Sequence, residues 1–327
     1  MPTLIEGRCS ICCLGYNHAA FIKQSIEAMW AQDYKNLEII ALDDGSKDNS
    51  VALLKELQAQ SPVPMSVIDQ VNTGNIGGNF NRCFEHASGE FVMFISLDDK
   101  LYPQAISEKM AFMNGHKKVA FGANSKIMGI DAYENIKDDV PALKLHDMKN
   151  PTISDLLELE YEEFGSFYIQ GTVFRSDIVR AFSGFDEEMT GDDIVLRTKF
   201  FLYMRDNPGY TFKVFDNPAC YHRKHDSNVH KNSYRQIKIV ALYLAKYWPE
   251  RENPKTLKMW MEYAISASSI KTFPKLFFIN GVTRRYLLQK DMWRFVIKNK
   301  FVARIRAKLK IRTRLKGGLQ TLTTLFR

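Results

Sequence analysis

The chain of 327 residues is long enough for one large domain and an appendage, and its 45% hydrophobic and 12% aromatic residues are typical of a packed core. No stretch approaches the ~20 apolar residues that span a bilayer, and the first residues, MPTLIEGR, lack an apolar signal region. The cytoplasm is therefore the expected compartment. Three of the five cysteines fall in one apolar segment, RCSICCLG, which favours buried thiols over a disulfide framework.

The charge is divided unequally along the chain. Residues 231–327 hold 23 Lys and Arg and four acids, a net charge of +19, so residues 1–230 carry −11 of the total of +8. A basic block of this size is typical of a segment that binds an anionic partner, such as membrane headgroups or nucleic acid. The change in charge separates a basic, aromatic-rich helical region, residues 231–327, from the rest of the chain.

Strand and helix patterns alternate from the N-terminus to about residue 127. The expected strands are 8–14, 37–44, 65–70, 91–99 and 119–127, and the expected helices are 21–32, 50–60, 79–88 and 104–115. Such alternation predicts an α/β fold with a mostly parallel sheet, right-handed crossovers and flanking helices. Residues 131–165 are predicted to be a polar insertion.

Polar side chains follow the first two predicted strands at the point where each ends. Tyr16 and Asn17 follow one strand, and Asp43 and Asp44 end the other. Open α/β sheets bind ligands at this edge. The Tyr16 ring can stack on a flat base, and Asp44 can accept a hydrogen bond from the imide of uracil or thymine. An Asx-rich turn with a helix N-cap would equally account for DDGSKDNS.

A glycine-rich loop, NTGNIGGNFN, leads into the helix predicted at residues 79–88. It lacks the Gly-Lys-Ser/Thr ending of a P-loop and is not a Rossmann fingerprint. Asn75 and Asn81 are candidate contacts to a bound donor, although ordinary loop chemistry also explains them.

Asp98 and Asp99 end the predicted strand 91–99 with no cationic side chain before Lys100. Such a pair either faces water or holds a divalent metal. Mg²⁺ or Mn²⁺ bound by these carboxylates and by phosphate oxygens would neutralise a diphosphate leaving group.

Two later groups of polar residues are also candidates. Asp192 and Asp193 precede a predicted helix, where acids cap the helix or serve as a general base. In ACYHRKHDSN, His222 and His225 are either surface residues or ligands of metal or phosphate.

Taken in order, these motifs closely resemble the family 2 glycosyltransferases of the GT-A fold. The matching pieces are YN, DDGSKDNS, N-x-G with a later Asn81, GEFVMFISLDD-x-x-x-P, GFDEE-x-x-GDD and Arg-x-His, over roughly residues 8–230. The resemblance implies a Rossmann-like GT-A catalytic domain at residues 1–230. It also implies inverting transfer of a sugar from a nucleotide-diphosphate donor with Mn²⁺ or Mg²⁺.

The resemblance assigns roles by position. It implies that Asp193 is the catalytic base, because Leu196 stands three residues later, with Asp192 in place of the usual Glu. The predicted nucleotide-binding residues are Tyr16, Asn17, Asp43, Asp44, Asn75, Asn81 and Asp98, and the predicted metal ligands are Asp98, Asp99 and His225. Ser96 stands where many members have a first metal-binding acid, and Phe80 replaces a basic residue often found before Asn81.

We expect a single-addition enzyme, because the sequence after residue 230 lacks the Gln-x-x-Arg-Trp signature of processive synthases. The expected donor is a UDP- or dTDP-sugar, and the expected acceptor is a glycan or lipid-linked glycan, as in bacterial surface polysaccharide assembly. A sugar nucleotidyltransferase is one alternative, although LGYNHAAFIKQ lacks its Gly-rich basic loop. A non-catalytic protein that binds through its basic tail is another.

Residues 284–316 are predicted to lie on an anionic membrane surface. The stripe of apolar residues at helical spacing consists of Trp293, Ile297, Phe301, Ile305 and Leu309, with basic residues around it. Residues 303–316 also alternate as a strand would, but Ala, Leu, Lys and Arg favour helix. Peripheral attachment to the inner face of the cell membrane is expected, with docking on the acidic domain as the alternative and no nucleic acid partner.

Overall fold

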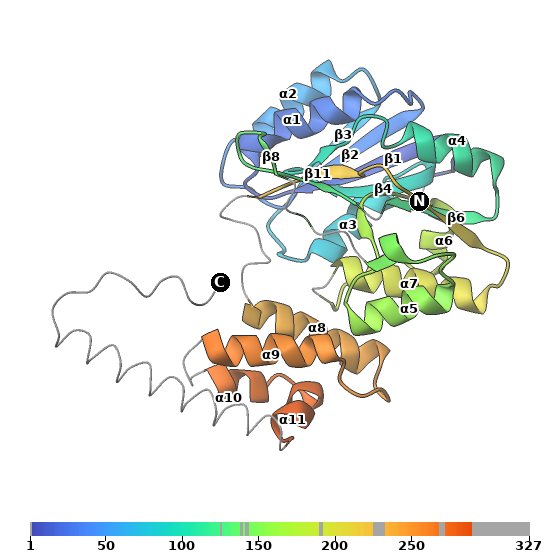
Figure 1. Ribbon diagram of the computed structural model, residues 1–327. Coiled ribbons are helices and arrows are strands. Elements are labelled where there is room, and N and C mark those ends of the chain that lie inside the picture. Colours follow the sequence, from blue (N-terminus) through green and yellow to red (C-terminus); the bar gives the residue numbers. More distant parts are fainter. Residues whose placement is uncertain are drawn as a thin grey trace, which may run out of the picture. The chain divides into compact units, whose positions relative to one another are not determined.

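The computed structural model describes residues 2–124, 126–137, 140, 144–189, 192–224, 233–267 and 272–289 (Figure 1). The chain divides into two compact units, Met1–Lys231 and Asn232–Arg327.

A seven-stranded sheet forms the centre of the first unit, in the order β10-β6-β9-β4-β1-β2-β3. The strands are β1 (Ile5–Gly15), β2 (Leu37–Asp43), β3 (Met65–Asp69), β4 (Gly89–Ser96), β6 (Val119–Asn124), β9 (Tyr168–Arg175) and β10 (Thr211–Phe215). Neighbouring strands are parallel except at β9, which is antiparallel to β4 and to β6. The mostly parallel α/β sheet predicted from the sequence is confirmed.

Helices cover both faces of this sheet (Figure 1). One face carries α1 (Ala19–Trp30), α2 (Ser50–Gln60) and α4 (Ser107–Gly115), and the other carries α3 (Ile76–Glu85), α5 (Ile153–Glu162), α6 (Ser176–Ala181) and α7 (Asp192–Asp206). Because β1 is central and covered on both sides, Ile11, Cys12 and Cys13 have no exposed surface. All five cysteines are buried free thiols.

The two faces have different cores. Aliphatic residues and methionines from α1, α2 and α4 pack on the first face, including Ile22, Leu54 and Met110. The second face is aromatic: the Phe94 ring lies 5.4 Å from Phe80 and 4.9 Å from Phe185, centroid to centroid, both edge to face. This aromatic cluster ties α3 to the chain that leads into α7.

A small four-stranded sheet follows the end of β4. It consists of β5 (Lys100–Leu101), β7 (Met128–Ile130), β8 (Ile136–Lys137) and β11 (Cys220–Arg223), in the order β5-β11-β7-β8. Because β5 starts four residues after β4 ends, the turn Leu97–Asp99 joins the two sheets. This places β11 beside the Asp98–Asp99 pair.

The prediction of a polar insertion at residues 131–165 was wrong. This segment contains a 3₁₀ helix (Lys144–Asp147) and the amphipathic α5, whose Leu156, Leu159 and Tyr161 are buried. Thr152 and Asp155 form a capping box at its start. The many acids of ELEYEE concealed the helical spacing of its apolar residues.

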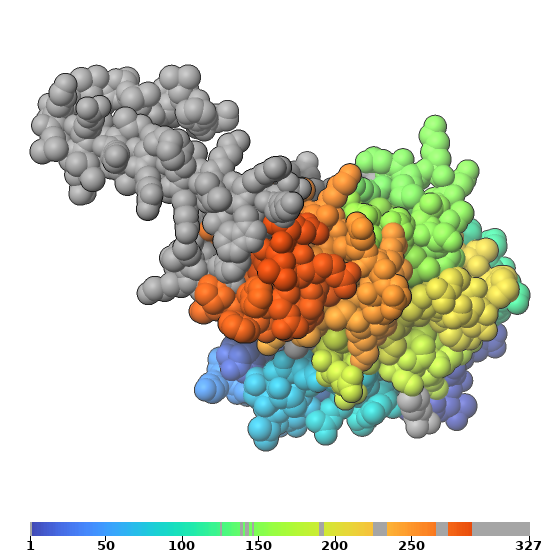
Figure 2. Space-filling view, turned by 90° about the horizontal axis from the view of Figure 1, so that it is seen from below, coloured from blue at the N-terminus to red at the C-terminus, as the bar shows by residue number. Residues whose placement is uncertain are grey.

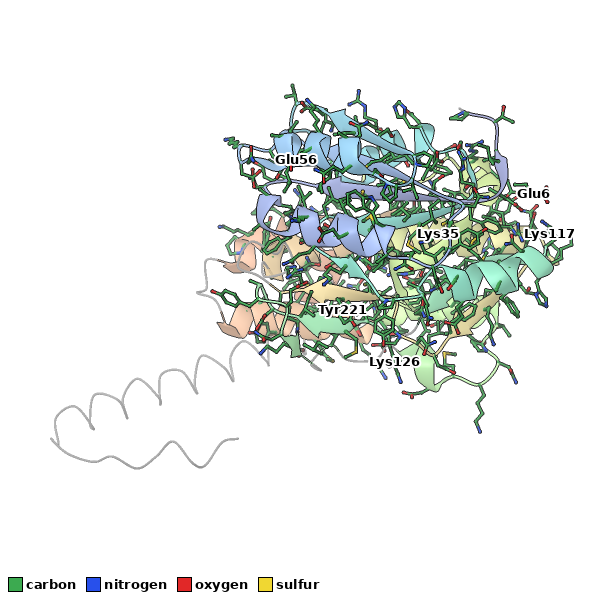
Figure 3. All side chains as sticks on the ribbon, turned by 90° about the horizontal axis from the view of Figure 1, so that it is seen from above. Glu6, Lys35, Glu56, Lys117, Lys126 and Tyr221 are labelled. Carbon is green, nitrogen blue, oxygen red and sulfur yellow. The ribbon has the colours of Figure 1, made fainter. Side chains whose placement is uncertain are left out.

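Surface ion pairs lie near the amino ends of the strands, away from the edge described below. Lys117 Nζ is 3.9 Å from Glu6 Oε1 and 3.5 Å from Glu90 Oε1, and Figure 3 shows Lys117 beside Glu6. Both Lys117 and Glu6 are well exposed, so this pair adds little stability.

The second unit is helical in its described part, with α8 (Ser233–Tyr247), α9 (Lys255–Ala267), α10 (Thr272–Phe277) and α11 (Gly281–Leu287). Asn280 caps α11 by accepting from Val282 N, and it donates to Ala241 O at 2.7 Å. None of the helices within the described ranges is long and apolar enough to cross a bilayer. The stripe predicted from Trp293 to Leu309 lies outside the described residues.

Candidate active site

The carboxyl ends of β1, β2 and β4 meet at one edge of the sheet. Gly15 pairs with Asp43, and Leu14 pairs with Ser96. The residues that follow these ends are the polar ones singled out in the sequence, so the structure brings the turns at 16–17, 43–44 and 98–99 together. Parallel α/β sheets bind ligands at such an edge.

Tyr16 and Asn17 form the turn after β1. The Tyr16 side chain is exposed, which leaves its ring face accessible to a base. Asn17 has a φ of +56°, a conformation that Asn tolerates better than most residues. Its N–H donates to Ser46 Oγ at 2.7 Å, and its Oδ1 accepts from Lys47 N at 2.8 Å. Asn17 therefore fastens the turn after β1 to the turn after β2.

Asp43 and Asp44 are both buried and have different partners. Asp43 accepts from Ser46 N at 2.7 Å and from Ser46 Oγ at 2.6 Å, which is the Asx turn considered as the alternative. Asp44 accepts from Thr73 N and Gln70 Nε2, each at 2.8 Å, and from Gly74 N at 3.0 Å. Burial raises the pKa of Asp44, but these hydrogen bonds outweigh it and hold the pKa below its usual value. Asp44 is therefore an ionised group that fixes the glycine-rich loop.

Asn75 and Asn81 both hold the segment that leads to α7. Asn75 caps α3 by accepting from Gly78 N at 3.0 Å, and its Nδ2 donates to Glu187 O at 2.9 Å. Asn81 Nδ2 donates to Phe185 O at 3.0 Å, and its Oδ1 accepts from Phe185 N at 2.8 Å. A polar pocket of about 280 Å³ lies here, lined by Thr73, Asn75, Gly78, Asn79, Arg82, Glu85 and Glu187. Asn75 lines this pocket, and Asn81 supports its wall.

The Asp98–Asp99 pair is buried beside two imidazoles. Asp99 Oδ1 accepts from Arg223 N at 2.9 Å and lies 3.1 Å from His222 Nδ1. Asp98 Oδ2 lies 3.7 Å from His18 Nε2. Burial and then the charge of Asp98 raise the pKa of Asp99, although His222 and the Arg223 N–H oppose them. Burial lowers the pKa of His222, but its contact with Asp99 outweighs this and the pKa is raised overall.

The donor chemistry at this pair fits a hard divalent cation. Within the described ranges, no three or more His, Cys, Asp or Glu residues are grouped to hold a metal by themselves. Mg²⁺ and Mn²⁺, however, are commonly bound by one or two carboxylates together with phosphate oxygens and water. The raised pKa of Asp99 reflects two buried like charges, which a cation would relieve. His225, the third predicted ligand, lies outside the described residues.

Arg223 is a site residue to which the sequence analysis gave no role. Its side chain is fully buried. Its Nε donates to Asp98 O at 2.9 Å, its Nη2 to Gln24 Oε1 at 2.8 Å and its Nη1 to Asp131 O at 3.1 Å. These bonds fix the backbone of the acidic pair against α1 and the β7–β8 hairpin. The Arg-x-His motif contained the signal, but only the histidine was given a role from it.

Asp193 lies at the start of α7, and its charge acts on the same buried thiol as the charges of the acidic pair. Burial raises the pKa of the Cys220 thiol at the start of β11, and the charges of Asp99, Asp193 and Asp98 raise it further. Three carboxylates therefore lie near one thiol. Asp193 is partly exposed, and its Oδ2 is 3.8 Å from Arg197 Nη1. α7 begins at Asp192, whose side chain lies outside the described part of the structure.

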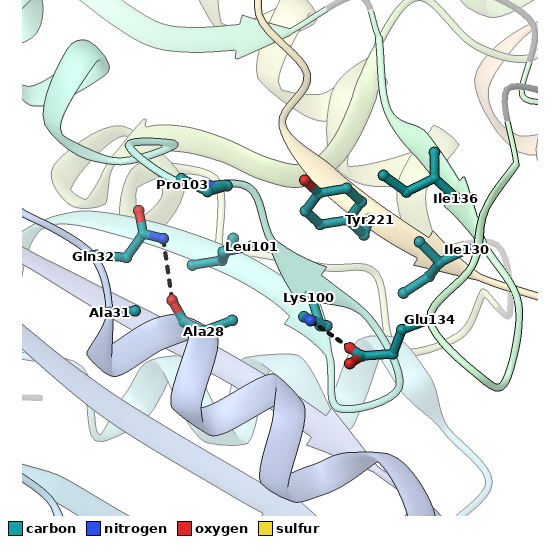
Figure 4. Close-up of a pocket in the computed structure, with 10 residues that line it drawn as sticks. All are labelled: Ala28, Ala31, Gln32, Lys100, Leu101, Pro103, Ile130, Glu134, Ile136 and Tyr221. Atoms are coloured by element: carbon teal, nitrogen blue, oxygen red, sulfur yellow. Dashed lines mark hydrogen bonds and ion pairs between the residues drawn. The ribbon is translucent and has the colours of Figure 1, made fainter.

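A larger pocket, of about 410 Å³, lies between α1 and the small sheet (Figure 4). Its lining comes from Ala28, Ala31, Gln32, Lys100, Leu101, Pro103, Ile130, Glu134, Ile136 and Tyr221. An ion pair between Lys100 and Glu134 crosses it. None of the residues predicted to bind nucleotide or metal lines this pocket.

Residues 10–165 match the model of the glycosyl transferase family 2. This segment, just under half of the chain, is of glycosyltransferase family 2. An uncharacterized glycosyltransferase of Nostoc sp. is 38% identical over 97 residues, which are 30% of this chain and 30% of the relative. The match thus spans under a third of that relative's length.

A longer match is with the GalNAc(5)-diNAcBac-PP-undecaprenol beta-1,3-glucosyltransferase of Campylobacter jejuni, at 26% identity over 234 residues, 71% of each protein. Among solved structures, S. aureus TarS 1–349 in complex with UDP-GlcNAc has a TM-score of 0.57 and 16% identity, covering 89% of this chain and 79% of TarS. The mannosyltransferase PcManGT from Pyrobaculum calidifontis, in complex with GDP-Man and Mn²⁺, has a TM-score of 0.55 and 15% identity, covering 92% and 86%. These likenesses confirm the predicted GT-A fold.

Proposed function

We propose that this protein is an inverting glycosyltransferase that moves a single sugar from a nucleotide-diphosphate sugar to a hydroxyl of a glycan or lipid-linked glycan. The observation that carries the proposal is the Asp98–Asp99 pair, which is buried at the carboxyl end of β4 and acts on the same buried thiol, Cys220, as Asp193 does. Family membership supports the reaction class. The nucleotide sugars bound to TarS and PcManGT support the donor class.

The donor's base is proposed to lie over the turns after β1 and β2. The exposed Tyr16 ring offers a stacking face. Asp44 is held as an anion and therefore suits the imide N–H of uracil or thymine, which favours UDP or dTDP. Asn17, Asp43, Asn75 and Asn81 would shape this subsite through the turns they fix.

Asp98 and Asp99 are proposed to hold Mn²⁺ or Mg²⁺, with His225 as a further ligand. When bound, the cation supplies positive charge that neutralises the diphosphate as it departs. The protein's own part is to keep both carboxylates in place. Arg223 Nε donates to the Asp98 backbone carbonyl at 2.9 Å, and His222 Nδ1 lies 3.1 Å from Asp99 Oδ1.

Asp193 is proposed to act as the general base, with Asp192 beside it. Its carboxylate accepts the proton of the acceptor hydroxyl while that oxygen forms a bond to the anomeric carbon. The bond from this carbon to the diphosphate oxygen breaks on the opposite face, so the configuration inverts. The main demand on the protein is the placement of one carboxylate beside the acceptor oxygen.

A lipid-linked acceptor is proposed from two observations. The name of the Campylobacter relative specifies an undecaprenol-linked acceptor. The basic residues 284–316 of this chain would hold the enzyme at the anionic inner face of the membrane, where such acceptors are concentrated, in surface polysaccharide assembly.

A donor screen tests the proposal. Full-length protein is incubated with UDP-, dTDP- and GDP-sugars and Mn²⁺, and release of the nucleoside diphosphate is measured with and without glycan acceptors. We expect release with one donor class, loss in EDTA and strong loss in Asp99→Ala. Release of pyrophosphate from a sugar phosphate and a nucleoside triphosphate would instead identify a nucleotidyltransferase and refute the proposal.

A further inference from the structure

A buried ion pair joins α5 to α7. Arg197 Nε donates to Glu160 Oε1 at 2.8 Å, and the two side chains are 4% and 0% exposed. The same Oε1 accepts from Ser166 N at 2.9 Å and from Ser166 Oγ at 2.5 Å, while Arg197 Nη1 donates to Phe167 O at 2.9 Å. In Figure 2 the lime to yellow segments, which include α5 and α7, adjoin one another. Both charged groups are therefore held in fixed positions.

This pair reaches the candidate base. Asp193 lies one turn before Arg197 on α7, and its Oδ2 is 3.8 Å from Arg197 Nη1. The guanidinium thus has Glu160 on one side and Asp193 on the other. A buried ion pair is often no more stabilising than an apolar pair of the same volume, so stability alone is a weak reason for this arrangement.

We propose that Arg197 and Glu160 are positioning residues, which together orient the Asp193 carboxylate and keep its proton affinity in the range that a general base needs. This inference rests on the proposed function, in which Asp193 is the base. Arg197 attracts and aims the carboxylate. Glu160 offsets much of the guanidinium charge, so the base is not made too acidic to accept a proton.

The opposing effects of Arg197 and Glu160 on the proton affinity of Asp193 follow from distance and burial. An opposite charge within ~4–6 Å commonly lowers a carboxylate pKa by about 1–3 units. The proton acceptor works best when its pKa is not far below the working pH. Glu160 lies closer to the guanidinium, at 2.8 Å, than Asp193 does, at 3.8 Å. The effect of Arg197 on Asp193 is therefore only partial.

Two further titratable groups act on members of this network from neighbouring strands. Cys220 on β11 interacts electrostatically with Asp193, Asp98 and Asp99. Burial and the nearby Cys220 raise the pKa of Tyr168 on β9, and the charge of Arg197 opposes the rise. Because both pKa values are raised from values of 9 or more, Cys220 and Tyr168 stay uncharged across the acidic limb in every variant below.

Removing Arg197 or Glu160 one at a time should shift the pKa of the base, Asp193, in opposite directions. Arg197→Met removes the positive charge, so the acidic limb of the kcat/KM profile should move to higher pH by about half a unit to one unit, less than the full effect of a buried charge because Asp193 is 31% exposed. Glu160→Gln leaves the guanidinium unbalanced, so the limb should move to lower pH. Arg197→Met should also lower kcat roughly ten- to a hundredfold with little change in donor KM, because the carboxylate loses its orientation.

Matched variants separate charge from structure. Arg197→Lys keeps the charge and should keep the limb near its wild-type position. Arg175→Met breaks a second partly buried pair, in which Arg175 Nη1 lies 3.0 Å from Glu90, and should lower stability without moving the limb. If Arg197→Met does not fold, the double variant Glu160→Gln/Arg197→Met removes both charges, and its limb should lie above wild type.

A readout that does not depend on turnover tests the positioning role of Arg197 and Glu160 separately from the proposed function. The Asp193 carboxyl is followed by ¹³C NMR in protein labelled at aspartate, with Asp193→Asn identifying its signal. Opposite shifts of its titration midpoint in Arg197→Met and Glu160→Gln, matched by the kinetic limbs, support the inference. An unmoved midpoint in both variants overturns it, whatever their activity. Wild-type protein that transfers no sugar overturns the proposed function instead, whatever the NMR signal does.

Discussion

Asn81 offers a sensitive test of how the candidate site is held together. Its side chain joins α3 to the segment before α7: Nδ2 donates to Phe185 O at 3.0 Å and to Glu187 Oε1 at 2.9 Å, and Oδ1 accepts from Phe185 N at 2.8 Å. Asn81→Ala removes all three bonds and leaves the Phe185 backbone groups without this partner. The Phe185 ring remains packed on Phe80 at 5.3 Å. The segment should loosen without the domain losing its core.

The free energy of unfolding lost in Asn81→Ala follows from these contacts. Each intramolecular hydrogen bond contributes about 1 kcal/mol net, and the contact with the exposed Glu187 counts for less, so we expect a loss of about 2 to 3 kcal/mol. For a domain of this size, 1 kcal/mol shifts the thermal midpoint by roughly 2–4 °C. Asn81→Ala should therefore lower the midpoint by about 4 to 12 °C.

Differential scanning fluorimetry of the full chain, with and without UDP and Mn²⁺, measures this effect. Asn36→Ala is the matched control, because Asn36 Nδ2 donates to Glu6 O at 3.2 Å at an exposed position. It should shift the midpoint by under about 2 °C, since surface substitutions usually cost little. Gly184→Ala should repeat the Asn81 effect, because Gly184 has a φ of +58° and a Cβ there would lie 2.4 Å from Asn81 Oδ1.

Asn81 does not hold this segment in place if Asn81→Ala leaves the midpoint within 2 °C of wild type, a window of about 0.5 to 1 kcal/mol. If such a stable variant also binds UDP much more weakly, Asn81 acts on the nucleotide rather than on the segment before α7.

Three further predictions concern the base, the core and the tail. Asp193→Asn should lower transfer roughly 10²- to 10⁴-fold while UDP binding stays near wild type, and greater loss in Asp192→Asn by the same assays would move the base by one residue. Burial lowers the pKa of Lys109 from 10.5 to about 8, so at pH 7 its charge costs the folded state about 3 kcal/mol. Lys109→Met should therefore raise the free energy of unfolding by about 1 to 3 kcal/mol in urea titrations at pH 7. The gap between variant and wild type should close between about pH 8 and 10.5, where the wild-type lysine binds more protons in the unfolded than in the folded state, and a less stable variant at pH 7 would contradict this. The full chain should co-sediment with anionic but not neutral vesicles and a version ending near residue 283 should not, whereas equal pelleting of both would exclude the membrane role.

Much of the fold could be predicted from local patterns in the sequence. The helix predicted at residues 50–60 matches α2 (Ser50–Gln60), and the strand predicted at 37–44 matches β2 (Leu37–Asp43) to within one residue. These elements have clear apolar periodicity and polar residues at their ends. The antiparallel direction of β9 was not predicted, because strand direction depends on pairing with β4 and β6, which lie far away in the chain.

The candidate site was predicted where chemistry and strand ends coincide, and missed where it depends on distant contacts. The proximity of the turns at 16–17, 43–44 and 98–99 could be predicted from the rule that the carboxyl ends of parallel strands meet at one edge of the sheet. Glu160 and Arg197 are 37 residues apart, and neither stands in a motif, so nothing local indicates their contact. His222 was considered as a possible ligand, but only folding shows that it lies beside Asp99.

The proposed function rests on the claim that Asp98 and Asp99 form a metal-dependent site for a nucleotide diphosphate. Isothermal titration of UDP, dTDP and GDP into the full chain, with Mn²⁺ or with EDTA, tests it directly, and Asp99→Ala is titrated in parallel. The claim predicts that one nucleotide binds wild-type protein with Mn²⁺, and that binding weakens at least about tenfold in EDTA and in Asp99→Ala, because the diphosphate then lacks its cation. Equal binding under all three conditions, or no binding of any nucleotide with Mn²⁺ present, would contradict it.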